Sequence, residues 1–170
     1  MSRLKPKHPH HHPPAVPRAV AAPPAGVPVA KPVVETKPIA KKSVLFVCIG
    51  NSCRSQMAEG FARQYGSDVI DASSAGLSPI SIIAPLTHKV MKDRGIDLSA
   101  QYPKGIADAP GQPWDLVINM SGMPFPSTAL GNLLTWDVKD PYTLAESVFV
   151  EVANDIERRV QDLIISLRRA

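Results

Sequence analysis

Residues 43–55 read SVLFVCIGNSCRS and join two different patterns. The apolar run over 43–48 is typical of a strand that is buried on both faces. Glycine and polar residues over 50–52 break this run, and apolar side chains at helical spacing then predict a helix over 56–65. The sequence therefore predicts a strand, a tight loop and a helix in immediate succession.

Strands and helices continue to alternate along the rest of the chain. Further strands are predicted over 68–74, 115–120 and 133–138, and a further helix over 84–94. A last helix is predicted from apolar residues that recur three or four apart, namely Val148, Val152, Ile156, Val160, Leu163 and Leu167. Thr143 and Glu146 have the spacing of a capping box for the last helix. This order predicts an α/β fold, a three-layer sandwich in which helices flank a four-stranded parallel sheet.

Residues 1–42 differ in composition from the rest of the chain. They hold ten of the 18 prolines and eight Lys or Arg residues against the single acid Glu35. Such a segment has no periodic apolar face to bury, so we predict a disordered, basic Pro-rich tail over 1–42 and a folded domain over 43–170. The domain itself is net acidic and carries no basic stripe, and nucleic-acid binding is not expected.

Composition also bears on location and metal binding. The apolar residues 19–22 are cut off by Pro23, so neither a signal peptide nor a membrane span is predicted. The chain has only two cysteines, which favours a reducing, cytoplasmic compartment. The histidines at positions 8 and 10–12 have no matching ligands in the domain, so no metal site is predicted.

The loop after the first predicted strand carries the chemistry. Backbone N–H groups of a tight, Gly-containing loop converge with those of a helix N-terminus and form a nest for an anion. Arg54 adds a planar guanidinium that can hold two oxyanion oxygens. Cys48 enters the loop beneath this positive potential, which stabilises a thiolate. A thiolate aimed at a bound tetrahedral oxyanion is a nucleophile suited to phosphoryl transfer.

Residues 44–59, VLFVCIGNSCRSQMAE, closely resemble the signature of the low-molecular-weight protein tyrosine phosphatase family. That family includes arsenate reductases with the same fold. The resemblance extends through Ser74-Ala75-Gly76 and residues 115–120 to Asp140-Pro141-Tyr142. It implies a four-stranded parallel sheet, no cofactor and a phosphocysteine intermediate.

The resemblance also implies a role for each residue of the loop. Cys48 would be the nucleophile and Arg54 the oxyanion clamp. Ser55 would donate a hydrogen bond to the thiolate, and Asn51 would hold the loop in a strained shape. The complete set of expected substrate-binding residues is Ile49, Gly50, Asn51, Ser52, Cys53 and Ser55.

A general acid must supply a proton to the leaving group. Asp140 matches this position of the family, and would protonate the leaving oxygen and then deprotonate the water that attacks the phosphocysteine. Asp137 is the local competitor for this role. Ile49, Tyr142 and Trp136 could form apolar walls for an aryl substrate.

The main hypothesis is therefore a cysteine-dependent phosphomonoester hydrolase, acting on protein tyrosine phosphate. Thr143, however, stands where many tyrosine phosphatases of the family carry a second tyrosine. One alternative is a non-catalytic binding module in which the Pro-rich tail docks to an aromatic-lined groove or an acidic partner.

The other alternative is an arsenate reductase. Gln56 stands where phosphatases of the family commonly have proline, and arsenate is a tetrahedral oxyanion like phosphate. Residues 120–126 contain no cysteine, so an internal three-thiol relay is impossible and the donor would be a small thiol or a glutaredoxin-like protein. Cys53 could form a reversible disulfide with Cys48, or could simply be a packing residue.

Overall fold

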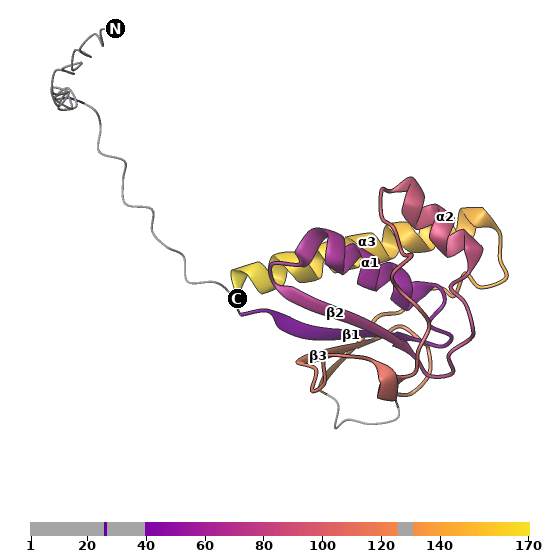
Figure 1. Ribbon diagram of the computed structural model, residues 1–170, viewed down its shortest axis with the longest axis horizontal. Coiled ribbons are helices and arrows are strands. Elements are labelled where there is room, and N and C mark those ends of the chain that lie inside the picture. The colour runs from indigo at the N-terminus through magenta and orange to yellow at the C-terminus, as the bar shows by residue number, and fades with distance from the viewer. Residues whose placement is uncertain (1–25, 27–39, 126–130) are drawn as a thin grey trace, which may run out of the picture. The chain divides into compact units, whose positions relative to one another are not determined.

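The computed structural model describes residues 26, 40–125 and 131–170. The predicted tail and its histidines lie almost entirely outside the described residues. Four strands and three helices follow one another as predicted (Figure 1). They are β1 (Lys42–Cys48), α1 (Arg54–Gly66), β2 (Ile70–Gly76), α2 (Pro85–Asp93), β3 (Leu116–Asn119), β4 (Asn132–Thr135) and α3 (Glu146–Arg169), with a short 3₁₀ turn, η1 (Ile106–Asp108), before β3.

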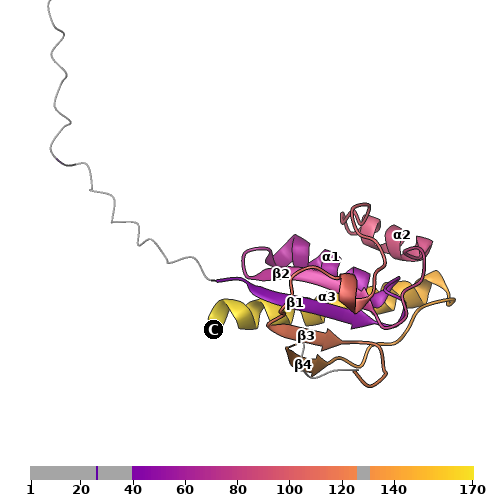
Figure 2. The ribbon, with the colours of Figure 1, turned by 60° about the horizontal axis from the view of Figure 1, so that its bottom comes forward.

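The sheet is entirely parallel, with strand order β2-β1-β3-β4 (Figure 2). β1 is therefore central, and it pairs along its whole length with β2 and over Val44–Val47 with β3. The α/β fold with a four-stranded parallel sheet is confirmed. Because the carboxyl end of a central strand faces the crevice where such sheets bind ligands, Cys48 lies at the expected place.

The two faces of the sheet are covered differently. Side chains alternate along β1, so that Val44 and Phe46 point to one face while Leu45 and Val47 point to the other. The first face packs against α1 and α3, which also pack against each other (Figure 1). The second face lies against Trp114 and its neighbours rather than against a long helix.

The last helix is amphipathic, as its apolar spacing predicts, but it is not capped as predicted. α3 begins at Glu146 with Ala145 as the N-cap, and no side chain caps it. Thr143 has a φ of +66° in the turn before the helix, and the carboxylate of Glu146 accepts a hydrogen bond from Lys89 at 2.6 Å. The predicted capping box is therefore wrong, because the helix begins after Ala145 rather than after Thr143, and Glu146 bonds Lys89 instead.

α3 is the longest helix at 24 residues. Across the described ranges, no helix is both long enough and apolar enough to cross a membrane.

The fourth strand is shorter than predicted. β4 ends at Thr135 and all of its residues are exposed, which fits its position at the edge of the sheet. Beyond it, Trp136 and Val138 turn inward and join the core. The predicted extension to residue 138 is wrong because burial of these two side chains takes the chain away from the sheet.

Gly76, the last residue of β2, supports the loop that follows β1. A Cβ built on Gly76 would lie 2.6 Å from the carbonyl oxygen of Ile49 and 2.9 Å from the amide nitrogen of Asn51. Both atoms belong to backbone, so they cannot rotate away as a side chain could. The loop can approach β2 this closely only because residue 76 has no side chain.

We expect Gly76→Ala to lower the free energy of unfolding by about 1–3 kcal/mol, since the added methyl overpacks the loop. Urea unfolding of the full chain measures this change. Gly105→Ala is the matched control, because its Cβ would meet only Pro79 at 3.9 Å. Equal free energies of unfolding for Gly76→Ala and Gly105→Ala would contradict the close approach of the loop to β2.

Candidate active site

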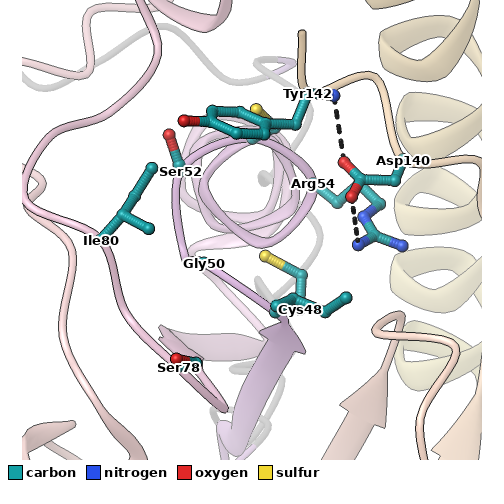
Figure 3. A pocket seen from close by; sticks show the side chains of 10 residues that line it. Cys48, Gly50, Ser52, Arg54, Ser78, Ile80, Asp140 and Tyr142 are labelled. Atoms are coloured by element: carbon teal, nitrogen blue, oxygen red, sulfur yellow. Dashed lines mark hydrogen bonds and ion pairs between the residues drawn. The ribbon is translucent and has the colours of Figure 1, made fainter.

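The loop over residues 49–53 joins β1 to α1 and forms the floor of a pocket of about 220 Å³. Its lining residues come from three separate parts of the chain and are Cys48, Ile49, Gly50, Ser52, Cys53, Arg54, Ser78, Ile80, Asp140 and Tyr142. Figure 3 shows the side chains of Cys48, Arg54 and Asp140 around this pocket. Folding thus brings together the three residues that the sequence assigns to catalysis.

The loop carbonyls point away from the pocket. Residues 77–84, between β2 and α2, run along the outer side of the loop and donate backbone hydrogen bonds to it. The pairs are Leu77 to Cys48 at 3.0 Å, Ser78 to Ile49 at 2.8 Å, Ile80 to Gly50 at 3.0 Å, and Ala84 to Ser52 at 3.2 Å. Because a trans peptide places its C=O and N–H on opposite sides, the next amide in each case points inward.

The inward amides have no protein partner. Within the described ranges, the N–H groups of residues 49–53 donate no hydrogen bond to backbone or side chain. They lie just before the N-terminus of α1, whose first N–H groups also lack partners within the helix. Together they form a concave set of donors that suits a tetrahedral oxyanion.

Arg54 adds charged donors to this set. The residue is buried, and its Nη1 donates to the carbonyl oxygens of Met120 at 2.5 Å and Val138 at 3.1 Å. Its Nε is a buried donor without a partner among the described residues. Buried donors are rarely left unpaired, so this Nε indicates a place for an oxyanion oxygen.

A hydrogen-bond chain fixes the direction of the proton next to the Cys48 sulfur. The Oδ1 of Asn51 accepts from the amide of Lys104 at 3.0 Å, so its Nδ2 donates to Ser55 Oγ at 2.7 Å and to Ser74 Oγ at 3.0 Å. Ser55 is therefore an acceptor toward Asn51, and its own hydrogen is free to donate to Cys48 Sγ, 2.8 Å away. This arrangement stabilises negative charge on the sulfur.

Asn51 and Ser55 lie behind the loop rather than in the pocket. Both are completely buried, and Asn51 has a φ of +50°, a left-handed conformation that Asn tolerates better than most residues. These positions agree with supporting roles, in which the side chains shape the loop. The pocket-facing members of the expected binding set are Ile49, Gly50, Ser52 and Cys53.

Sequence reasoning missed a buried polar cluster beneath the loop. Ser74 Oγ donates to the Oε1 of buried Glu59 at 2.9 Å, and Lys104 Nζ lies 4.0 Å from the same oxygen. Burial lowers the pKa of Lys104, while the charge of Glu59 acts in the opposite direction. The one sign of this cluster in the sequence was the charged residue Glu59, between Ala58 and Phe61 on the buried side of α1. Lys104 gave no such sign, because it lies in a segment without a helix or strand pattern.

The second cysteine has a different environment from the first. Cys53 is packed into the main hydrophobic core, and burial raises the pKa of its thiol to about 11, with a smaller upward contribution from nearby Cys48. It is therefore a neutral thiol under ordinary conditions. Both cysteines are free in the structure, and the Cys48–Cys53 disulfide stays a prediction.

The structure separates the two candidate acids. Asp140 lines the pocket, with one carboxylate oxygen 3.4 Å from Arg54 Nη2 and the other accepting the amide of Tyr142 at 3.1 Å (Figure 3). Asp137 is exposed and does not line the pocket, and its carbonyl oxygen accepts from Arg159. Only Asp140 is in position to reach a leaving group.

One of the expected walls is misplaced. Ile49 and Tyr142 line the pocket, but Trp136 is buried and packs against Phe46, with ring centroids 6.0 Å apart. The expectation for Trp136 is wrong because its indole belongs to the core.

Within the described part of the chain, no three His, Cys, Asp or Glu side chains gather as metal ligands.

We expect Arg54→Lys to weaken binding of inorganic phosphate roughly 100-fold, because lysine cannot supply both the unpaired Nε and a planar fork. Isothermal titration calorimetry measures this affinity directly. Arg159→Lys is the matched control, since Arg159 bonds the neighbouring segment outside the pocket. A similar loss in both variants would show that the effect is not specific to the pocket.

The family model described as low molecular weight phosphotyrosine protein phosphatase matches residues 43–129. The chain is 35% identical over 130 residues to the glutaredoxin arsenate reductase of Synechocystis sp., a match that covers 74% of this chain and 98% of that relative.

Solved structures similar to this chain include both arsenate reductases and a tyrosine phosphatase. "An arsenate reductase in the phosphate binding state" has a TM-score of 0.68 at 35% identity and covers 74% of this chain and 98% of its own. The low molecular weight protein tyrosine phosphatase from T. tengcongensis has a TM-score of 0.62 at 28% identity, with 75% of this chain and 100% of its own covered. The chain belongs to the low molecular weight phosphotyrosine protein phosphatase family.

Proposed function

We propose that this protein reduces arsenate to arsenite, with Cys48 as the nucleophile and an external thiol as the source of electrons. The observation that carries the proposal is the set of inward amides and the unpaired Arg54 Nε around the Cys48 pocket, which suits a small tetrahedral oxyanion. Arsenate is favoured over a phosphate ester because the similar full-length relative is an arsenate reductase. The phosphatase preferred on sequence alone becomes the second candidate.

In the first step, the Cys48 thiolate attacks arsenic and a sulfur–arsenic bond forms. The arsenic–oxygen bond opposite the sulfur breaks, and the departing hydroxyl takes a proton from Asp140 and leaves as water. The remaining oxygens stay on the loop amides and Arg54, which stabilise the charge that develops on them. Ser55 donates a hydrogen bond to the Cys48 sulfur before the attack, and this hydrogen bond breaks as the sulfur–arsenic bond forms.

In the second step, a thiol of the donor attacks the Cys48 sulfur. A sulfur–sulfur bond forms, the sulfur–arsenic bond breaks, and its electron pair remains on arsenic, which leaves as arsenite. A second donor thiol then attacks the mixed disulfide, releases the oxidised donor and regenerates the Cys48 thiolate. Two thiols are oxidised for each arsenic reduced by two electrons.

The donor must be external because the chain has no suitable second thiol. The sequence contains only Cys48 and Cys53. Cys53 is buried and its raised pKa, about 11, keeps it protonated and poorly nucleophilic. Because its full-length relative is named a glutaredoxin arsenate reductase, we propose a glutaredoxin-type protein or its small thiol as the donor.

The proposal is tested by arsenite formation from arsenate with glutathione and glutaredoxin, for the parent chain and Cys48→Ser. We expect arsenite from the parent and none from the variant. Mass spectrometry after one turnover with glutathione alone should find Cys48 joined to glutathione in a mixed disulfide. An internal disulfide between the two cysteines, or arsenite formation by Cys48→Ser, would contradict the mechanism.

Hydrolysis of an aryl phosphate is the second candidate function. The pocket mouth has an apolar rim of Ile49, Ile80 and Tyr142, between 37% and 50% exposed, which inorganic arsenate does not need. An aryl leaving group in line with the Cys48 sulfur would contact this rim. Asp140 at the same mouth would protonate the leaving oxygen and then activate water.

Asp140→Asn tests the general-acid role, which both candidates assign to Asp140. Loss of the general acid should lower hydrolysis of an aryl phosphate by about 10²–10⁴-fold, while phosphate affinity changes little. The rate is measured with p-nitrophenyl phosphate and the affinity by calorimetry. Absence of hydrolysis by the parent chain would exclude this second function.

A further inference from the structure

Gln56, in the first turn of α1, is completely buried and contacts the loop from behind. Its Nε2 donates to the carbonyl oxygen of Asn51 at 3.0 Å and to that of Tyr102 at 3.1 Å. Its Oε1 accepts from Gln101 Nε2 at 2.8 Å. Every polar group of the side chain is thus used, and an amide turned by 180° would place its oxygen against two carbonyls.

The carbonyl of Asn51 depends on Gln56 in a way that the other loop carbonyls do not. The carbonyls of Cys48, Ile49, Gly50, Ser52 and Cys53 each accept a backbone amide. Within the described residues, the carbonyl of Asn51 accepts only the side chain of Gln56. Removing that side chain would leave a buried acceptor without a partner.

The orientation of this carbonyl determines the orientation of the next amide. The peptide between Asn51 and Ser52 is planar, so an outward carbonyl at residue 51 places the Ser52 N–H toward the pocket. The central peptide of a tight turn has two accessible orientations, which differ by a rotation of about 180°. In the second orientation the carbonyl dipole would face a bound oxyanion and repel it.

We propose that Gln56 is a positioning residue that holds the Asn51–Ser52 peptide in its anion-binding orientation. The helix itself does not use this side chain, because its hydrogen bonds go to Asn51, Tyr102 and Gln101, all outside α1. Packing alone does not require it either, since an apolar side chain would fill the same buried space without hydrogen bonds. The role of the Gln56 side-chain amide is therefore to orient the loop.

Gln56→Met tests the proposal in the full chain, with inorganic phosphate as the probe. We expect the phosphate Kd to rise about tenfold or more, since the binding orientation is no longer held. Thr87→Val is the matched control. Thr87 is equally buried and donates to the carbonyl of Ser52 at 3.0 Å, but that carbonyl keeps the amide of Ala84. Its Kd should change less than about twofold.

Melting temperatures of both variants separate positioning from general destabilisation. A comparable loss of stability in the two, with a loss of affinity only in Gln56→Met, supports the proposal. A folded Gln56→Met that binds phosphate within about twofold of the parent overturns it. Phosphate binding requires no turnover, so this result is independent of whether arsenate or an aryl phosphate is the substrate.

A second variant keeps the proposal testable if Gln56→Met does not fold. Gln101→Met removes the amide that orients Gln56, and among the described residues the side chain of Gln101 makes no hydrogen bond to residues 49–53. We expect the phosphate Kd to rise about threefold, because Gln56 can then leave its orientation for part of the time. An unchanged Kd for a folded Gln101→Met, together with misfolding of Gln56→Met, would reduce Gln56 to a structural residue.

Discussion

The site depends on one constraint: the carbonyls of the loop must all be bonded on its outer side so that its amides can face inward. Residues 77–84 satisfy most of these carbonyls through backbone bonds, and Gly76 allows the loop to lie close enough to β2. The donors that face the pocket are consequently backbone groups, whose directions are set by the fold and need no rearrangement when an anion arrives. Preorganised donors of this kind are the usual basis of oxyanion stabilisation in enzymes.

Buried polar side chains maintain this constraint from behind. Asn51 bonds two serines and the amide of Lys104, and Glu59 lies within 4.0 Å of Lys104. Isolated polar groups in such a place would destabilise the fold, but each of these is paired with another. The result is a rigid support, in which the proton on Ser55 is directed to the Cys48 sulfur.

The two cysteines show how position separates chemically identical groups. Both thiols are buried and both line the pocket, but Cys48 accepts a hydrogen bond from Ser55, whereas burial raises the pKa of Cys53, five residues later, to about 11. This difference supports the proposal that Cys48, and not Cys53, is the nucleophile. A reductase built on this chain therefore draws electrons from another molecule, which agrees with the absence of further cysteines.

The sequence alone determined the strand–loop–helix unit, the parallel α/β fold and the grouping of Cys48 and Arg54, because these follow from local periodicity and from residues close in the chain. It also indicated Asp140, although only the fold showed that Asp140 and not Asp137 reaches the pocket. Trp136 and the length of β4 were mispredicted, since burial against distant residues overrides local pattern. The capping box was mispredicted because the helix begins after Ala145 and Glu146 bonds Lys89. The roles of Gly76, Gln56 and Lys104 were decided by the tertiary structure alone, because each depends on residues far away in sequence. Gly76 lies against the backbone of Ile49 and Asn51, the Lys104 amide bonds the Asn51 side chain, and the Gln56 amide is oriented by Tyr102 and Gln101.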